Sequence, residues 1–181
     1  ELMDSKVVAA EDIKGIGVTG QGEGCWLIDK EGKPLQNAIL WCDGRAVAEV
    51  HKITEEHPEI GKLYHRTTGT PPLLGNQMML LRWMKSHRKD VLDKGYKILF
   101  CKDWIRYNLT GKIGTEITDS FTSLIDAQTG KIAEDLMKEL DIFEYRDYLP
   151  DPVDSDEVVG TILNSVAEET GLAKGTPVVA G

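Results

Sequence analysis

The sequence predicts an α/β domain in which short strands alternate with helices along the chain. Its 181 residues are enough for one domain that buries most of its apolar surface. Hydrophobic residues make up 41% and charged residues 28% of the chain, as in ordinary globular proteins that need no disulfide or metal framework. Segments with strand and helix periodicity are mixed from end to end, which favours an α/β or mixed α+β arrangement.

Three short strands are expected in the first quarter of the chain. Residues 14–19, 25–28 and 38–41 are short apolar or alternating runs. The glycine-rich segment GQGEG joins the first run to the second, and the turn sequence DKEG lies between the second and the third. We expect the three strands to form an antiparallel meander at one edge of a mixed sheet.

Helix and strand signals continue through the rest of the chain. The first helix is expected over residues 44–57 and ends at Pro58, and a second helix is expected over residues 76–87. The remaining expected elements are a strand at 96–100, helices at 101–111, 133–140 and 165–172, an ordered loop at 149–160 and a closing strand at 176–181.

The charge balance excludes several classes of partner. The net charge of −9 disfavours binding to the phosphate backbone of nucleic acid and to anionic membranes. No apolar run approaches the roughly 20 residues that a membrane helix needs, and the first residues lack a signal-peptide pattern. We therefore expect a cytoplasmic protein with no nucleic-acid and no membrane partner.

The cysteines and histidines form no recognisable redox or metal motif. Cys25, Cys42 and Cys101 are widely spaced and odd in number, so we expect reduced, buried thiols. The four histidines do not have the spacing of metal ligands on one helix face. The sequence therefore predicts no metal site.

Gly15, Gly17 and Gly20 spell G-x-G-x-x-G, a pattern also found in dinucleotide-binding proteins. In those proteins the glycines lie in a turn between a strand and a helix, and the helix N-terminus binds the pyrophosphate. Here the first two glycines lie within the expected strand, and another strand follows the loop. A nicotinamide oxidoreductase is kept as an alternative, which binding of a nicotinamide cofactor would test.

The same segment suits a ligand that is rich in hydroxyl groups. Its glycines let the backbone approach a ligand closely, and Gln21 and Glu23 can each bridge two hydroxyls. Further on, WCDGR offers the indole of Trp41 and the polar side chains of Asp43 and Arg45. An indole beside polar groups is a common way to bind polyols. A core tryptophan beside a solvated Asp–Arg pair explains the second segment equally well.

Three blocks of sequence resemble, in order and spacing, the N-terminal domain of the FGGY carbohydrate kinases. This group includes xylulokinase, glycerol kinase and the erythritol and L-xylulose kinases. The blocks are IKGIGVTGQGEGCWLIDKEGKPLQNAILWCDGR, CKDWIRYNLTGKIGTEITD and VVGTILNSVAEETGLAKGTPVVAG. The resemblance runs from about Ile13 to Gly181 and implies a ribonuclease H-like, actin-like ATPase domain. Residues 1–181 would be part of this sugar-binding domain.

The resemblance also implies which residues bind the substrate. The GQGEG segment matches the sugar-binding loop of the family, which assigns substrate binding to Gln21, Gly22 and Glu23. Trp41 matches an aromatic residue that packs near the substrate in glycerol kinase. Asp43 belongs to the W-x-D-x-R block of the family. No residue of the chain is assigned a catalytic role.

Some positions depart from the family pattern or match it without an implied substrate contact. Leu80 stands three residues before Trp83, where many relatives have a lysine. With GQGEG in place of GQMHG and CKDW in place of PKDY, this difference favours the erythritol or L-xylulose kinase branch. Asp103 and Asp119 match positions that we interpret as structural.

The reaction implied by the resemblance is transfer of a phosphoryl group from ATP, with Mg²⁺, to a hydroxyl of a pentulose or small polyol. An aspartate accepts the proton of the attacking hydroxyl. We expect that aspartate after Gly181, the first phosphate-contacting hairpin before Glu1, and a second, ATP-binding domain outside the chain. The chain is therefore expected to be incomplete at both ends and inactive as a kinase by itself.

Two questions stay open at this stage. A non-catalytic sugar-binding or regulatory domain of the same fold is the alternative function, and the test is whether an aspartate follows Gly181. The other question is the assembly, for which a homodimer is kept beside a monomer.

Overall fold

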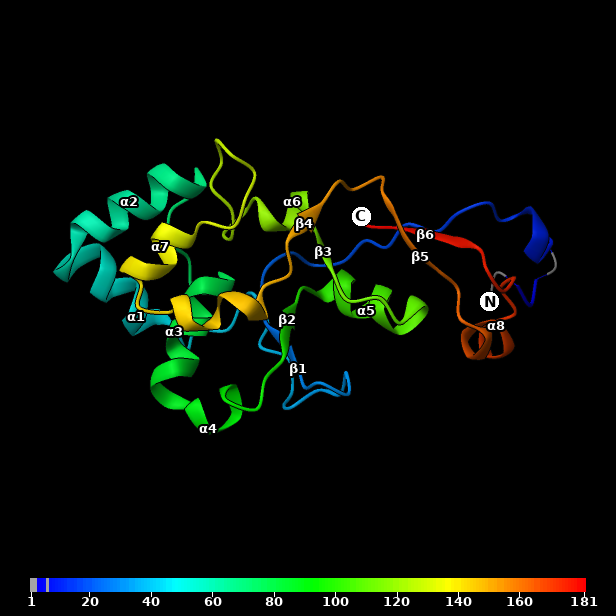
Figure 1. The fold of residues 1–181 in the computed structure, drawn as a ribbon, viewed down its shortest axis with the longest axis horizontal. Helices are drawn as coiled ribbons and strands as arrows, with labels where there is room; N and C mark the ends of the chain where they lie inside the picture. The colour runs from blue at the N-terminus through cyan, green and yellow to red at the C-terminus, as the bar shows by residue number, and fades with distance from the viewer. Residues whose placement is uncertain (1–2, 6) are drawn as a thin grey trace.

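The computed structural model describes residues 3–5 and 7–181 and confirms the expected α/β class. Helices α1, α2, α3 and α7 gather at one end of the elongated molecule, and β5, β6 and α8 lie at the other (Figure 1). Strands β1 to β4 and helix α5 lie between them. In chain order the elements are η1 (Ala10–Asp12), β1 (Trp26–Ile28), α1 (Val47–His51), η2 (Lys52–Glu56), α2 (Pro58–Thr68), α3 (Gln77–His87), α4 (Lys89–Leu92), β2 (Lys97–Leu99), α5 (Cys101–Thr110), β3 (Thr115–Glu116), α6 (Ile117–Ser120), α7 (Glu134–Glu139), η3 (Phe143–Tyr148), β4 (Pro152–Val153), β5 (Val158–Thr161), α8 (Asn164–Thr170) and β6 (Pro177–Val179).

The hydrophobic core extends from the helical end of the molecule to strands β1 and β2. Helix α3 buries residues 78–81 completely, one after the other, so neighbouring elements cover it on more than one face. Leu80 belongs to this run, and a lysine there would place a charge in an apolar environment. The helices predicted at 76–87, 101–111, 133–140 and 165–172 are confirmed. No helix in the described residues is both long and apolar enough to cross a membrane.

Pro58 marks two helix boundaries at once. The first helix continues from α1 into the π-helical segment η2 and ends before Pro58, as predicted, but the same proline begins α2. Proline fits the first position of a helix because the N–H that it lacks has no partner there. At Gly61 a Cβ would lie 2.7 Å from the carbonyl oxygen of Ile53, so the two helical segments approach more closely than a side chain would allow.

The strands pair in three two-stranded sheets in the described part of the chain. Strand β1 is antiparallel to β2, β3 is parallel to β4, and β5 is antiparallel to β6. The first strand of the expected meander finds a different partner, because Ile16 forms a parallel bridge with Val178 of β6. The second and third expected strands keep their antiparallel contact as a bridge between Cys25 and Ile39. The bridge between Ile16 and Val178 could not be predicted from a local turn sequence, because the two residues are far apart in the chain.

The cysteines are unpaired but differ in their environments. Cys25 is buried, as expected, and burial raises the pKa of its thiol to about 12. The expectation of a buried thiol holds only in part for Cys101, which is partly buried, and is wrong for Cys42, which is exposed. Cys42 follows Trp41 on a surface turn, where no apolar periodicity applies.

Candidate functional site

The glycine-rich loop at residues 20–24 runs across the start of helix α5. A Cβ at Gly20 would lie 3.5 Å from the backbone nitrogen of Lys102, so the loop is in contact with the first turn of the helix. Gly24 has φ +90°, and a Cβ there would lie 2.6 Å from the carbonyl oxygen of Ile39. Strand β1 follows the loop, as predicted, so the loop does not lead into a helix as a dinucleotide site requires.

Glu23 fixes this loop to two distant parts of the chain. Its carboxylate accepts hydrogen bonds from Asn76 Nδ2 at 2.8 Å, Gln77 N at 3.1 Å and Ser123 Oγ at 2.9 Å. Its φ of 59° lies in the left-handed region, which residues other than glycine rarely adopt. Burial raises the pKa of Glu23, and these hydrogen bonds and one from Thr122 oppose the rise. Protein donors thus hold the carboxylate in one orientation.

Glu23 also contributes to the wall of a surface pocket of about 400 Å³. Trp41 supplies an aromatic wall and is 56% exposed. The chain passes very close behind this tryptophan, because a Cβ at Gly75 would lie 2.1 Å from its carbonyl oxygen. The other lining residues are Cys42, Leu73, Leu74, Gly75 and Asn76. The pocket combines an exposed indole with a fixed carboxylate, which suits packing against the C–H surface of a hydroxylated ligand.

Asp43 lies two residues beyond Trp41, and its carboxylate is held within the chain. Arg45 donates from Nε and from Nη2 to its two oxygens, each at 2.8 Å. Hydrogen bonding from Arg45 lowers the pKa of Asp43. The guanidinium in turn lies 4.9 Å from the ring centroid of Trp83. These contacts give the pair a supporting role beside the pocket, and contact of Asp43 with substrate stays a prediction.

Under the loop lies a buried charge cluster that the sequence analysis did not predict. Lys102 Nζ lies 2.6 Å from Glu116 Oε1 and 3.5 Å from Asp119 Oδ2. Burial alone would raise the pKa of Glu116, but hydrogen bonds from Lys102, Ser155 and two backbone amides outweigh it and lower the pKa to about 2. Asp119 Oδ1 faces the loop, where a Cβ at Gly22 would lie 3.4 Å away. The cluster thus connects α5 and α6 to the loop.

Asp103 and Arg106 form a second buried ion pair on α5. Asp103 accepts a hydrogen bond from Phe100 N at 3.2 Å and lies 3.1 Å from Arg106 Nη2. Arg106 also donates to the carbonyl oxygen of Ala180, just after β6. Burial raises the pKa of Asp103 to about 6, although Arg106 opposes the rise. The pair ties the start of α5 to the last strand, in keeping with the structural interpretation of Asp103.

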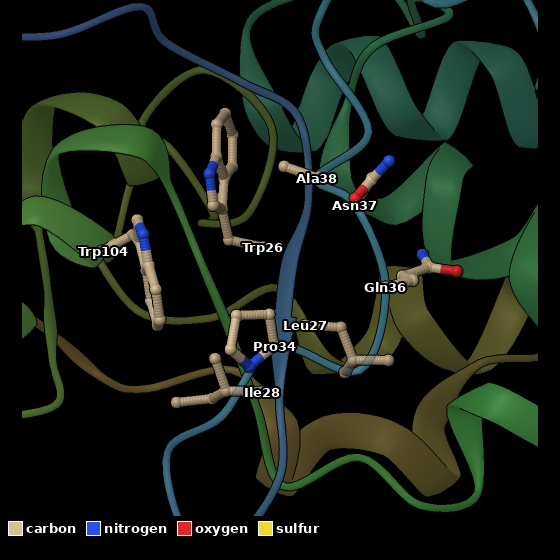
Figure 2. Close-up of a pocket in the computed structure, with 8 residues that line it drawn as sticks. All are labelled: Trp26, Leu27, Ile28, Pro34, Gln36, Asn37, Ala38 and Trp104. Atoms are coloured by element: carbon tan, nitrogen blue, oxygen red, sulfur yellow. The ribbon is translucent and has the colours of Figure 1, made fainter.

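A further pocket of about 220 Å³ lies beside β1 (Figure 2). Trp26 and Trp104 supply its aromatic walls, and Gln36 and Asn37 add amides at its edge. The indole of Trp26 also packs against the loop, since a Cβ at Gly24 would lie 2.9 Å from Trp26 Cζ3. The eight residues that line this pocket include none of the predicted substrate-binding residues.

The structure brings the predicted residues together only in part. Glu23 and Trp41 line one pocket, and Gln21 and Gly22 lie on the preceding part of the same loop. Asp43 pairs with an arginine next to that pocket. Substrate contact by each of the five stays a prediction.

Comparison with solved structures shows that the fold is of the actin-like ATPase type. The crystal structure of xylulose kinase from Rhodospirillum rubrum matches the chain with a TM-score of 0.83 and 27% sequence identity, covering 93% of this chain and 34% of that chain. The chain belongs to the FGGY family of carbohydrate kinases, because it matches the N-terminal domain of that family over residues 1–181.

Two curated relatives show how much of a family member the chain represents. L-xylulose/3-keto-L-gulonate kinase of Escherichia coli (strain K12) is 38% identical over 182 aligned residues, which cover 99% of this chain and 36% of the relative. Xylulose kinase of Bacillus subtilis (strain 168) is 34% identical, with 100% of this chain and 36% of the relative covered. The chain therefore spans about a third of the length of these relatives.

Proposed function

We propose that this chain is part of the sugar-binding domain of a longer kinase that uses ATP to phosphorylate a hydroxyl of a pentulose or small polyol. Membership of the FGGY family supports the kinase class. The names of the relatives support the substrate class, since L-xylulose and xylulose are pentuloses. The chain contributes the glycine-rich loop and the pocket beside it.

The observation that carries this proposal is the pocket shared by Glu23 and Trp41. The indole is more than half exposed although it lies on a folded segment, so its face is available to a ligand. Three hydrogen bonds to the carboxylate of Glu23 hold the loop in a strained backbone conformation. A strained loop that is held in this way is typical of a preorganised binding site. The apolar ring would pack on carbon and the loop would bind hydroxyls.

ATP and Mg²⁺ are the cofactors that we propose for the longer protein. Within the described residues, no three or more histidine, cysteine, aspartate or glutamate side chains are grouped so that they could hold a metal ion. Our proposal assigns no metal ligand and no phosphoryl-transfer step to this chain. We infer that the aspartate base follows Gly181 and that the 181-residue chain alone does not transfer phosphate.

The test is ADP release by the full-length protein with Mg-ATP and a panel of D-xylulose, L-xylulose, ribulose, erythritol, glycerol and gluconate. The 181-residue chain is assayed beside it. A strong signal on a pentulose or small polyol, with silence from the short chain, supports the proposal. Phosphate transfer by the short chain would contradict its assignment as an inactive fragment, and silence from the folded full-length protein would favour the non-catalytic alternative.

A pair of variants connects the activity to the pocket. Trp41→Ala is expected to raise the KM for the sugar by about 10-fold or more, because the ring supplies much of the contact area. Phe143→Ala removes another exposed aromatic ring, on η3, and is expected to leave the KM unchanged. Equal changes in KM for the two variants would show that the sugar does not bind in this pocket.

A further inference from the structure

Several residues in the glycine-rich loop or in contact with it carry a buried polar atom that has no hydrogen-bond partner within the part of the chain that the structure describes. In the described residues, five buried side-chain nitrogen or oxygen atoms have no hydrogen-bond partner. Three of them belong to residues of the loop or in contact with it: Gln21, Gln77 and Asp119. Such atoms are costly and rare in folded proteins, so a group of them around one loop indicates a ligand that supplies the partners.

One type of ligand group can form a hydrogen bond with each of the three atoms. Gln21 Nε2 donates hydrogen bonds, whereas Gln77 Oε1 and Asp119 Oδ2 accept them. A hydroxyl group can satisfy both kinds because it carries one donor and two acceptor sites. Gln77 is 2% exposed and its Nε2 already donates to the carbonyl oxygen of Leu99 at 3.2 Å. Its orientation is therefore fixed, and its Oε1 has no donor among the described residues.

Asp119 supplies the stronger of the two acceptors, because its side chain is a carboxylate and that of Gln77 is an amide. Its Oδ1 faces the backbone of Gly22, and its Oδ2 lies 3.5 Å from Lys102 Nζ, beyond the length of a good hydrogen bond. The ammonium group is closer to Glu116, at 2.6 Å. Burial raises the pKa of Asp119, Lys102 opposes the rise, and Glu116 adds to it. A hydroxyl that donates to this carboxylate would favour its ionised form.

We propose that Asp119 determines substrate specificity by accepting a hydrogen bond from one hydroxyl of the sugar, with Lys102 and Glu116 behind it as positioning residues. This inference rests on the proposed function, because it needs a hydroxylated ligand at the loop. It replaces the structural interpretation of Asp119 by direct contact with the substrate. Gln21 and Gln77 complete the polar surface around the same ligand.

The test compares Asp119→Asn with the wild type in the full-length protein. Binding of D-xylulose, L-xylulose and their monodeoxy derivatives is measured by calorimetry without ATP, and kcat/KM is measured with ATP. The variant is expected to bind the parent sugar about 10- to 100-fold more weakly, because a hydrogen bond to a charged group is lost. It is expected to bind one deoxy derivative as well as the wild type does, within about threefold.

A control and a second pair of variants sharpen the comparison. Asp135→Asn, which removes an exposed carboxylate on α7, is expected to leave every affinity unchanged. Lys102→Met is expected to raise the pH below which sugar affinity is lost, because the ammonium group no longer favours the ionised carboxylate. Lys102→Arg should restore the wild-type profile. If the dependence of sugar affinity on pH is the same in Lys102→Met as in the wild type, Lys102 is not a positioning residue.

The remaining outcomes also decide the matter. An equal loss of affinity for the parent sugar and for every deoxy derivative would overturn the contact. If Asp119→Asn does not fold, Asp119→Ser takes its place, and failure of both to fold would restore the structural interpretation. A wild type that binds sugar without transferring phosphate contradicts the proposed function and leaves the binding test intact. A wild type that binds neither a pentulose nor a small polyol contradicts both.

Discussion

Replacing Glu116 by glutamine removes the charge at the centre of the buried cluster and keeps the size of the side chain. Glu116 is fully buried and lies 2.6 Å from Lys102 Nζ. Its pKa, lowered from 4.5 to about 2, corresponds to roughly 3 kcal/mol of stabilisation at pH 7. The variant also leaves Lys102 without its closest partner. We therefore expect Glu116→Gln to lower the free energy of unfolding by about 3–5 kcal/mol at pH 7.

The pH dependence of this loss follows from the direction of the pKa shift. Because the pKa of Glu116 is lower in the folded state, its stabilisation is fully present above the ordinary value of 4.5 and is lost as the pH falls toward about 2. At pH 3 its contribution is roughly 1 kcal/mol. The difference between the wild type and Glu116→Gln should therefore narrow by about 2 kcal/mol between pH 7 and pH 3.

Equilibrium urea unfolding followed by tryptophan fluorescence measures this difference at both pH values. Glu144→Gln is the matched control, because Glu144 pairs with Lys85 on the surface and half of its side chain is exposed. We expect the control to change the free energy of unfolding by less than about 1 kcal/mol at either pH. If the difference in free energy of unfolding between the wild type and Glu116→Gln is the same at pH 3 as at pH 7, the reasoning from the pKa is refuted.

Three further predictions concern the loop, the second ion pair and the pocket. Gly24→Ala should lower the urea midpoint by the equivalent of about 1–3 kcal/mol because of its φ of +90° and the nearby Ile39 carbonyl, whereas Gly44→Ala, which has open space around it, should change it little. A smaller effect at Gly24 than at Gly44 would contradict the close approach. The buried carboxylate of Asp103 binds its proton more tightly in the folded state, so the free energy of unfolding of the wild type should fall as the pH rises from 3.8 to about 6. Asp103→Asn should remove this fall. Equal slopes of the free energy of unfolding against pH in the wild type and the variant would count against the prediction. Trp41→Ala should leave the Tm within about 2 °C, since the exposed ring adds little to the core, yet weaken sugar binding measured by calorimetry.

The helices could be predicted because their signals are local. Helices α5 and α8 end at Gly111 and Gly171, both in the left-handed conformation that favours glycine after a helix. The sequence therefore marks the end of each helix, but apolar spacing does not give the buried face, because α5 buries Lys102, Asp103 and Arg106 and α8 buries no residue. Helix α2 was missed because Pro58 is compatible with the end of one helix and with the start of the next.

The contacts that build the site could not be predicted from local patterns. Glu23 accepts a hydrogen bond from Ser123, which lies 100 residues further along the chain. Its hydrogen bond with Asn76 joins the loop to the start of α3 across 53 residues. The loop could be identified from its composition, but the donors that fix it come from segments whose own sequences carry no sign of the partner. The resemblance to a family identified the loop and not the charge cluster beneath it.

The bridge between Ile16 and Val178 has a consequence for how the protein is made. A ribosome adds about 5–20 residues per second, so the segment around Ile16 emerges on the order of 10 s before its partner strand exists. Until then its backbone groups are free to pair with other chains. Gly15 and Gly17 lower the strand propensity of this segment, which makes such pairing less favourable. The same glycines that resemble a nucleotide motif thus make pairing with other chains less favourable before β6 has been synthesised.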